Sequence, residues 1–317
     1  MPPNPRALEW LDKMNSLGAK DISLLSPAEG REEDKRTTLP FLTAPEPVER
    51  IENRRIRAGL SEIPVRIYWP KISEEEDEQD LYPIVVYFHG GGFVLGSLDL
   101  YDEICCMLSN RSEAIVVSVD YRLAPEHKFP MAVHDCYAAT KWAFENAKLL
   151  EGDVDTIVVT GDSAGGTLVT SACLESREKN GPQIALQVSI YPITDLTRDL
   201  TKYSKDRFGP SKEIMDWYIK YYTKNSSDLR DPLASPGLAD LRDLPPAVVV
   251  TAELDPLREQ DLDFVEKLES SGVKVKLLDY PGMIHGSVSL PGYFGDGRDA
   301  VEKIGSEIKK VYVENVM

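Results

Sequence analysis

A serine between two glycines is the clearest chemical signal in the sequence: residues 161–165 read Gly-Asp-Ser-Ala-Gly. The pattern Gly-x-Ser-x-Gly is typical of a nucleophilic serine on a sharp turn between a strand and a helix. The context agrees, because residues 157–160 predict a strand and residues 164–179 predict a helix. The glycines leave room for the turn, and the helix N-terminus provides positive potential where negative charge develops. The alternative role for Ser163 is a helix N-cap in an ordinary loop.

Three successive glycines follow a second predicted strand, residues 84–88, in the stretch His-Gly-Gly-Gly-Phe at residues 89–93. Glycine runs cost conformational entropy on folding and therefore need a structural reason. A backbone that approaches a substrate oxygen supplies one, because its amide groups then point into the site. A phosphate-binding loop is the rival interpretation, but no lysine followed by serine or threonine completes that motif.

A base and an acid for Ser163 are available further along the chain. His285 stands in the loop after predicted strand 273–280, and functional sites of α/β sheets assemble at such carboxyl ends. The order serine, acid, histidine along the chain is that of one known group of hydrolases. The acid is expected after strand 247–251, where both Glu253 and Asp255 could orient the imidazole. The residues alone favour Asp255 only modestly and leave Glu253 open.

Apolar strands alternate with longer helical patterns along the chain, which predicts a mostly parallel sheet with helices on both faces. Residues 63–69 instead alternate between apolar and polar, as a half-exposed antiparallel strand would. Lys274 and Lys276 place strand 273–280 near an edge of the sheet. The remaining strands are predicted at residues 84–88, 115–120, 157–160, 185–190 and 247–251, and the helices at residues 131–147, 164–179, 256–270 and 299–313.

Two stretches do not fit this alternation. Residues 1–55 contain one amphipathic segment, 6–17, followed by a charged, proline-rich linker, and residues 194–235 contain a short aromatic helix, 211–222. We interpret both as parts of a helical cap, which gives an N-terminal cap segment at 1–55 and a catalytic domain at 56–317 with a cap insertion at about 194–235. Surface decoration is the alternative. The acidic run at 74–80 is expected to be a solvated loop.

The overall charge limits the classes of partner. The 317 residues include 53 acidic and 36 basic side chains, a formal net charge of -17. Such a surface repels phosphate backbones and anionic lipid, so neither nucleic acid nor a membrane is expected as a partner. No apolar run reaches the length of a membrane-spanning helix, and the first ten residues do not resemble a secretory signal, so a cytoplasmic location is expected. The four cysteines are predicted to be small buried hydrophobes in a reducing compartment: Cys105, Cys106, Cys136 and Cys173.

Five segments together resemble the hormone-sensitive-lipase-like (family IV) microbial carboxylesterases of the α/β-hydrolase superfamily. They are residues 89–93, residues 120–126 (Asp-Tyr-Arg-Leu-Ala-Pro-Glu), residues 161–166, residues 252–258 (Ala-Glu-Leu-Asp-Pro-Leu-Arg) and residues 285–286 (His-Gly). The resemblance spans the whole predicted catalytic domain. It implies an α/β-hydrolase fold with a mostly parallel eight-stranded sheet flanked by helices, a helical cap, and a homodimer.

The resemblance also implies roles for single residues. Asp255, which matches the aspartate of the Asp-Pro-Leu-Arg segment, becomes the acid of a triad with Ser163 and His285. The oxyanion hole is then formed by the backbone amides of Gly91, Gly92 and Ala164. No metal and no organic cofactor is required.

Three further residues are interpreted in the light of the resemblance. His89 is expected to be structural, and Arg122 is expected to form a buried pair with Glu126. Ser287 departs from the family, which often carries an aromatic residue after the His-Gly pair, so the shape of the pocket is expected to differ there.

The predicted function is a serine carboxylesterase that hydrolyses short- to medium-chain acyl esters through an acyl-enzyme intermediate. The alternatives are an amidase or arylacetamide-deacetylase-like hydrolase, and a non-catalytic receptor on the same fold; the presence of His285 favours an enzyme. The short, charged cap segments argue against long-chain triglycerides, because a lipase needs a broad apolar surface. Four aromatic residues of the second cap segment could wall off a short pocket or only pack the cap onto the core: Trp217, Tyr218, Tyr221 and Tyr222.

Overall fold

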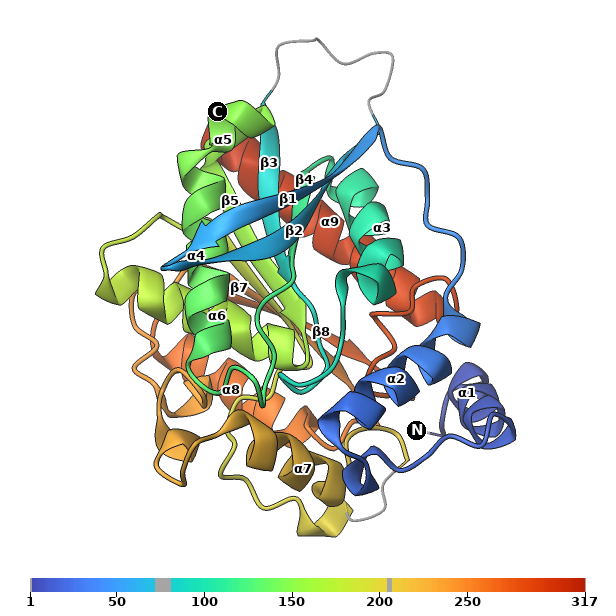
Figure 1. Ribbon diagram of the computed structural model, residues 1–317. Helices are drawn as coiled ribbons and strands as arrows, with labels where there is room; N and C mark the ends of the chain where they lie inside the picture. Colours follow the sequence, from blue (N-terminus) through green and yellow to red (C-terminus); the bar gives the residue numbers. More distant parts are fainter. Residues whose placement is uncertain (1, 72–80, 204–206, 317) are drawn as a thin grey trace.

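A twisted eight-stranded sheet forms the centre of the computed structural model, which describes residues 2–71, 81–203 and 207–316 (Figure 1). The predicted loop at 74–80 lies outside the described residues. The strands are β1 (Arg50–Ala58), β2 (Ser61–Trp69), β3 (Tyr82–Phe88), β4 (Ile115–Val119), β5 (Gly152–Asp162), β6 (Leu186–Ile190), β7 (Ala247–Ala252) and β8 (Val275–Tyr280). The helices are α1 (Pro5–Ser16), α2 (Pro27–Thr38), α3 (Asp102–Ser112), α4 (Met131–Glu145), α5 (Ala147–Leu150), α6 (Ala164–Glu178), α7 (Lys212–Tyr222), α8 (Arg258–Ser270) and α9 (Gly295–Val316).

The strand order within the described residues is β1-β2-β4-β3-β5-β6-β7-β8. Strand β2 runs antiparallel to both β1 and β4, whereas the pairs from β4 to β8 are parallel. The mostly parallel sheet and the antiparallel strand at 63–69 are therefore confirmed. Strand β8 lies at the edge, as predicted, and both Lys274, just before it, and Lys276, within it, are exposed.

Both faces of the sheet are covered because successive side chains of a strand point to opposite faces. In β3, Ile84 and Val86 join one apolar cluster, whereas Val85 and Tyr87 join the other. Helices α4, α6 and α8 contribute to the first cluster, and helices α3 and α9 contribute to the second. Figure 1 shows α4 and α6 on one side of the sheet and α3 with α9 on the other. Parallel strands that are buried on both faces have continuous apolar sequences, and for this reason these strands could be predicted.

Two elements lie where the sequence predicted only a linker. Helix α2 begins with a capping box, in which the Ser26 side chain accepts from the amide of Glu29 and the Glu29 carboxylate accepts from the amide of Ser26. Strand β1 pairs with β2 from Arg50 onward, so the expected domain boundary between residues 55 and 56 falls inside a strand. Both elements are rich in charged residues, so their small buried faces could not be recognised in the sequence.

Two smaller predictions concern side chains away from the site. The four cysteines are buried and free, as expected. The pair proposed between Arg122 and Glu126 is wrong. Arg122 instead forms a two-point ion pair with the fully buried Asp135, at 2.6 and 2.9 Å, and Glu126 pairs with Arg31 of α2 at 2.6 Å.

Candidate active site

Ser163 stands on the sharp turn between the central strand β5 and helix α6, where the sequence predicted it. Its backbone has φ 54° and ψ -119°, a conformation that non-glycine residues rarely adopt. The turn packs against the end of β3: a side chain at Gly161 or Gly165 would collide with the carbonyl oxygen of Phe88. The two glycines are therefore required by close packing, and together they present the serine at the carboxyl end of the sheet.

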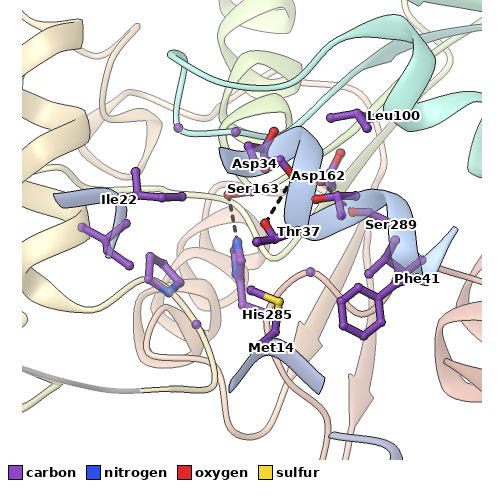
Figure 2. Close-up of a pocket in the computed structure, with 18 of the residues that line it drawn as sticks. Met14, Ile22, Asp34, Thr37, Phe41, Leu100, Asp162, Ser163, His285 and Ser289 are labelled. Atoms are coloured by element: carbon purple, nitrogen blue, oxygen red, sulfur yellow. Dashed lines mark hydrogen bonds between the residues drawn. The ribbon is translucent and has the colours of Figure 1, made fainter. Parts of the chain in front are cut away.

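A chain of hydrogen bonds links Ser163, His285 and Asp255, and Figure 2 shows the bond between Ser163 and His285. The Ser163 Oγ lies 2.9 Å from His285 Nε2, and His285 Nδ1 lies 2.6 Å from the Asp255 carboxylate. With the proton of the neutral imidazole on Nδ1, the ring donates to Asp255 and accepts from the serine hydroxyl. Asp255 is fully buried and also accepts from the amide of Leu257 at 2.9 Å.

Glu253, the other carboxylate considered, has a different position. Its side chain accepts from the backbone amide of Gly282 at 2.7 Å, in the turn that precedes the histidine loop. The loop itself is held by the amide of His285, which donates to the carbonyl of Phe208 at 2.8 Å. The structure thus brings Asp255, and not Glu253, to the imidazole.

The glycine loop after β3 lies in the same cavity as Ser163. Gly91 and Gly92 have φ of 109° and 60°, and both line the cavity. The Gly91 carbonyl accepts from the amides of Val94 and Leu95, which closes the loop into a tight turn. Ala164 is the first residue of α6, and the first amides of a helix have no acceptor within the helix. Gly91 and Gly92 therefore share a cavity with the serine, and Ala164 follows it directly in the chain.

Asp162, which occupies a variable position of the Gly-x-Ser-x-Gly motif, is a further residue of the site and was not predicted from the sequence. Its buried carboxylate accepts from the Tyr87 hydroxyl at 2.8 Å, the Gly90 amide at 3.0 Å and the Ser289 hydroxyl at 2.7 Å. Tyr101 donates a fourth, longer bond at 3.3 Å. Burial raises the pKa of Asp162, against the effect of these hydrogen bonds. Asp162 thereby joins the serine turn to the glycine loop and to the histidine loop.

His89 has a structural environment, as expected. It is completely buried, its Nδ1 lies 2.7 Å from the Gly90 carbonyl, and its ring stacks on Tyr121 at 4.4 Å. Burial lowers the pKa of His89, which favours the neutral ring. Ser287, the departure from the family pattern, is buried as well, and on this side Gly286 and Ser289 line the cavity.

The cavity above the serine has a volume of about 270 Å³. Both proposed cap segments contribute to it, through helices α1, α2 and α7, which lie together in Figure 1. Its apolar lining residues are Trp10, Met14, Ile22, Phe41, Leu100, Ile193, Pro210, Ile214, Met215, Leu290 and Phe294. Its polar side chains are Asp34, Thr37, Thr38, Tyr101, Asp162, Ser163, Arg207, Tyr218, His285 and Ser289.

Of the four aromatic residues considered for the pocket wall, Tyr218 lines the cavity and the others have packing contacts. Trp217 donates from its indole to the carbonyl of Leu25 at 2.8 Å, and Tyr221 packs on the Trp217 ring at 5.0 Å. Tyr222 stacks on Phe93 of the glycine loop at 3.8 Å. These side chains therefore fasten α7 to the first cap segment and to the core.

Within residues 2–71, 81–203 and 207–316, no group of three or more histidine, cysteine or acidic side chains is arranged to hold a metal ion. No helix in that part of the chain is long and apolar enough to cross a membrane.

Known proteins are similar to this chain in sequence and in fold. A family described as having the alpha/beta hydrolase fold matches residues 85–289. The chain is 39% identical to carboxylesterase NlhH of Mycobacterium tuberculosis over 272 aligned residues. The alignment covers 83% of this chain and 84% of that protein. It is 38% identical over 271 residues to an arylesterase of Saccharolobus solfataricus, with 84% and 85% covered.

A solved structure agrees over almost the full length. The hyperthermophilic esterase of the archaeon Pyrobaculum calidifontis has a TM-score of 0.91 and 38% identity, and the match covers 99% of this chain and 100% of that one. The chain therefore belongs to the α/β-hydrolase family, in its hormone-sensitive-lipase-like branch of microbial carboxylesterases. It is a carboxylic ester hydrolase.

Proposed function

We propose that the protein hydrolyses carboxylic esters by a two-step acyl transfer in which Ser163 is the nucleophile, His285 the base and Asp255 the orienting acid. The position of His285 between the serine hydroxyl and the buried carboxylate supports this proposal most directly. His285 takes the hydroxyl proton as Ser163 Oγ bonds to the ester carbonyl carbon, and then passes that proton to the departing alcohol. Water enters by the same route and releases the acid, which regenerates the serine.

The negative charge on the carbonyl oxygen is stabilised, in this proposal, by the amides of Gly91, Gly92 and Ala164. Backbone donors fixed before the reaction require no reorganisation as the charge develops, and this is the main advantage of such a site. The hydrogen bond from the Gly90 amide to Asp162 supports a preformed glycine loop, because it anchors the residue next to the two donors.

Substitution of the triad tests this assignment. Ser163→Ala and His285→Ala should each reduce kcat on the order of 10³-fold or more with little loss of stability, since triad members act as one unit. Asp255→Asn should be severely impaired, whereas Glu253→Gln provides the matched control. Labelling with a fluorophosphonate should require Ser163, and an unlabelled serine would favour the receptor alternative. Full activity of Ser163→Ala would refute the assignment.

We further propose that the preferred substrates are short- to medium-chain acyl esters. The cavity of about 270 Å³ is slightly smaller than the usual range for ligand pockets, and its lining is mostly apolar. Each methylene that fits should contribute roughly 0.8 kcal/mol, so kcat/KM should rise with chain length until the cavity is full. Measurement of kcat/KM from acetyl to palmitoyl p-nitrophenyl esters tests this; a maximum at the longest chains would contradict it.

We also propose a homodimer, which the family resemblance implies, and a cytoplasmic location, which was expected from the sequence. Sedimentation of the purified chain measures the first, and fractionation of cells that produce it measures the second. A monomer over the micromolar range would contradict the dimer.

A further inference from the structure

An acidic side chain lies inside the cavity that contains Ser163. Asp34 projects from helix α2, and Figure 2 shows it in the pocket with Thr37 and Leu100. A carboxyl group in a mostly apolar cavity carries a desolvation penalty, so its presence calls for a compensating interaction. Burial raises the pKa of Asp34 to about 6, while the amide of Gly96 and the hydroxyl of Thr38 act in the opposite direction. At neutral pH the group is therefore predominantly a carboxylate.

Two tyrosines line the same cavity as this carboxylate. Tyr218 comes from α7 and its ring lies directly against Gly92, whereas Tyr101 ends the short helix Leu98–Tyr101 and bonds to Asp162. The charge of Asp34 contributes to raising the pKa of both hydroxyl groups, which places both within its field. Aromatic faces attract cations, and they do so more strongly where water is excluded.

The remaining charged and titratable groups of the cavity are Asp162, His285 and Arg207. Asp162 is held by the four hydrogen bonds described above, and His285 is engaged with Asp255. Arg207 is exposed and donates to Asn15 of α1 at 2.6 Å. It is not among the groups that set the pKa of Asp34, which are burial, Gly96 and Thr38.

We propose that Asp34, Tyr101 and Tyr218 form a subsite for a positively charged ammonium group, so that the enzyme prefers esters carrying such a group over neutral esters of the same shape. The inference rests on the proposed esterase function and specifies its substrate class. A carboxylate has about four acceptor positions, so its bonds to Gly96 and Thr38 leave capacity for a ligand. The net charge of -17 would also raise the local concentration of cationic substrates.

Two pairs of esters with matched shapes test the subsite. Butyrylcholine and 3,3-dimethylbutyl butyrate differ only in the charge on the alcohol portion. Ethyl 4-(trimethylammonio)butanoate and ethyl 5,5-dimethylhexanoate differ only in the charge on the acyl portion. These charges are permanent, so any titration in the assay belongs to the protein. Chromatographic measurement of the released butyrate or ethanol gives kcat/KM for each member at any pH.

The readout is the change in the ratio of kcat/KM between charged and neutral members from one variant or pH to another, because any difference in intrinsic reactivity between the two esters is the same in each comparison and cancels. For at least one pair the ratio should exceed one in the wild type and fall about tenfold in Asp34→Asn, because the attraction between the carboxylate and the ammonium group is lost. Glu32→Gln, an exposed change on the same helix with the same loss of charge, should leave the ratio unchanged. In the wild type the ratio should also fall as the pH is lowered through about 6, where Asp34 takes up a proton.

The outcomes separate this inference from the proposed function. Hydrolysis of the neutral esters with no preference for either charged partner would overturn the subsite and leave the esterase intact. Hydrolysis of no ester at all would overturn both. Because the pH dependence of the ratio is measured on the wild type, the subsite can be refuted even if Asp34→Asn fails to fold: a ratio independent of pH between 5 and 8 would refute it.

Discussion

A buried acid that the catalytic proposal does not use gives a sharp prediction about stability. Asp261 of helix α8 is fully buried, and neither of its carboxyl oxygens has a hydrogen-bond partner among the described residues. Burial raises its pKa well above the ordinary value, the neighbouring Asp255 raises it further, and Arg258 opposes both. In the unfolded chain the pKa of an aspartate is ~3.9. The folded protein therefore keeps a proton on Asp261 over a pH range in which the unfolded chain has lost it.

The sign of the effect follows from this difference in bound protons. As the pH rises from about 4 towards the raised pKa of the folded state, the unfolded chain is stabilised by ionisation and the folded protein is not. Asp261 thus reduces the free energy of unfolding by about 1.4 kcal/mol for each pH unit in that range. Asp261→Asn keeps the size of the side chain and removes the ionisation. The variant should therefore gain stability relative to the wild type as the pH rises.

Unfolding by guanidinium chloride at several pH values between 4.5 and 7 measures this gain. Groups that the substitution does not affect titrate equally in the variant and the wild type. Their contributions therefore cancel in the difference between the two free energies of unfolding. Glu266→Gln, an exposed acid on the same helix, should give a difference that changes little with pH. A constant difference for Asp261→Asn across this range would show that the buried acid is ionised or solvated in the folded protein, and would refute the reasoning.

Three further substitutions test contacts around the site. Arg122→Ala should lower the free energy of unfolding by about 3–5 kcal/mol in denaturant titrations, because it leaves the buried Asp135 charge unpaired; retained stability would mean that Asp135 takes up a proton or reaches water. Arg31→Ala should raise KM more than it lowers kcat, because Arg31 holds α2 over the cavity through Glu126 and the carbonyls beside the glycine loop; an unchanged KM would mean that α2 is held by other contacts. Asp162→Asn should lower kcat by about tenfold through loss of a charged acceptor, while Ser163 remains open to labelling by fluorophosphonate; unaltered kcat would refute its positioning role.

The sheet and the three loops of the candidate site could be predicted because local constraints specify them. The turn at Ser163 requires glycines on both sides, and the buried parallel strands require continuous apolar runs, so each leaves a pattern within a few residues. The position of His285 after β8 then follows from chain order. These features can be predicted from the sequence without knowledge of the tertiary structure.

The features that were missed depend on distant partners. Helix α2 buries only Gly30, Glu33 and Thr37, so it lacks an apolar stripe, although its capping box at Ser26 was a usable signal. The sequence predicted that Arg122 pairs with the nearby Glu126. Each of these residues instead forms an ion pair with a separate element, and no short-range pattern encodes such pairs. The same holds for Asp162, whose four donors come from three other parts of the chain.

The backbone conformation of Ser163 has a consequence for protein engineering. A residue with a side chain held at φ 54° and ψ -119° carries a conformational cost of about 1–3 kcal/mol that the rest of the fold must offset. Glycine at this position would relieve that cost and would remove the hydroxyl at the same time. A library selected for thermal resistance alone would therefore enrich inactive sequences at position 163. Directed evolution of this enzyme should couple every selection for heat tolerance to a screen for turnover.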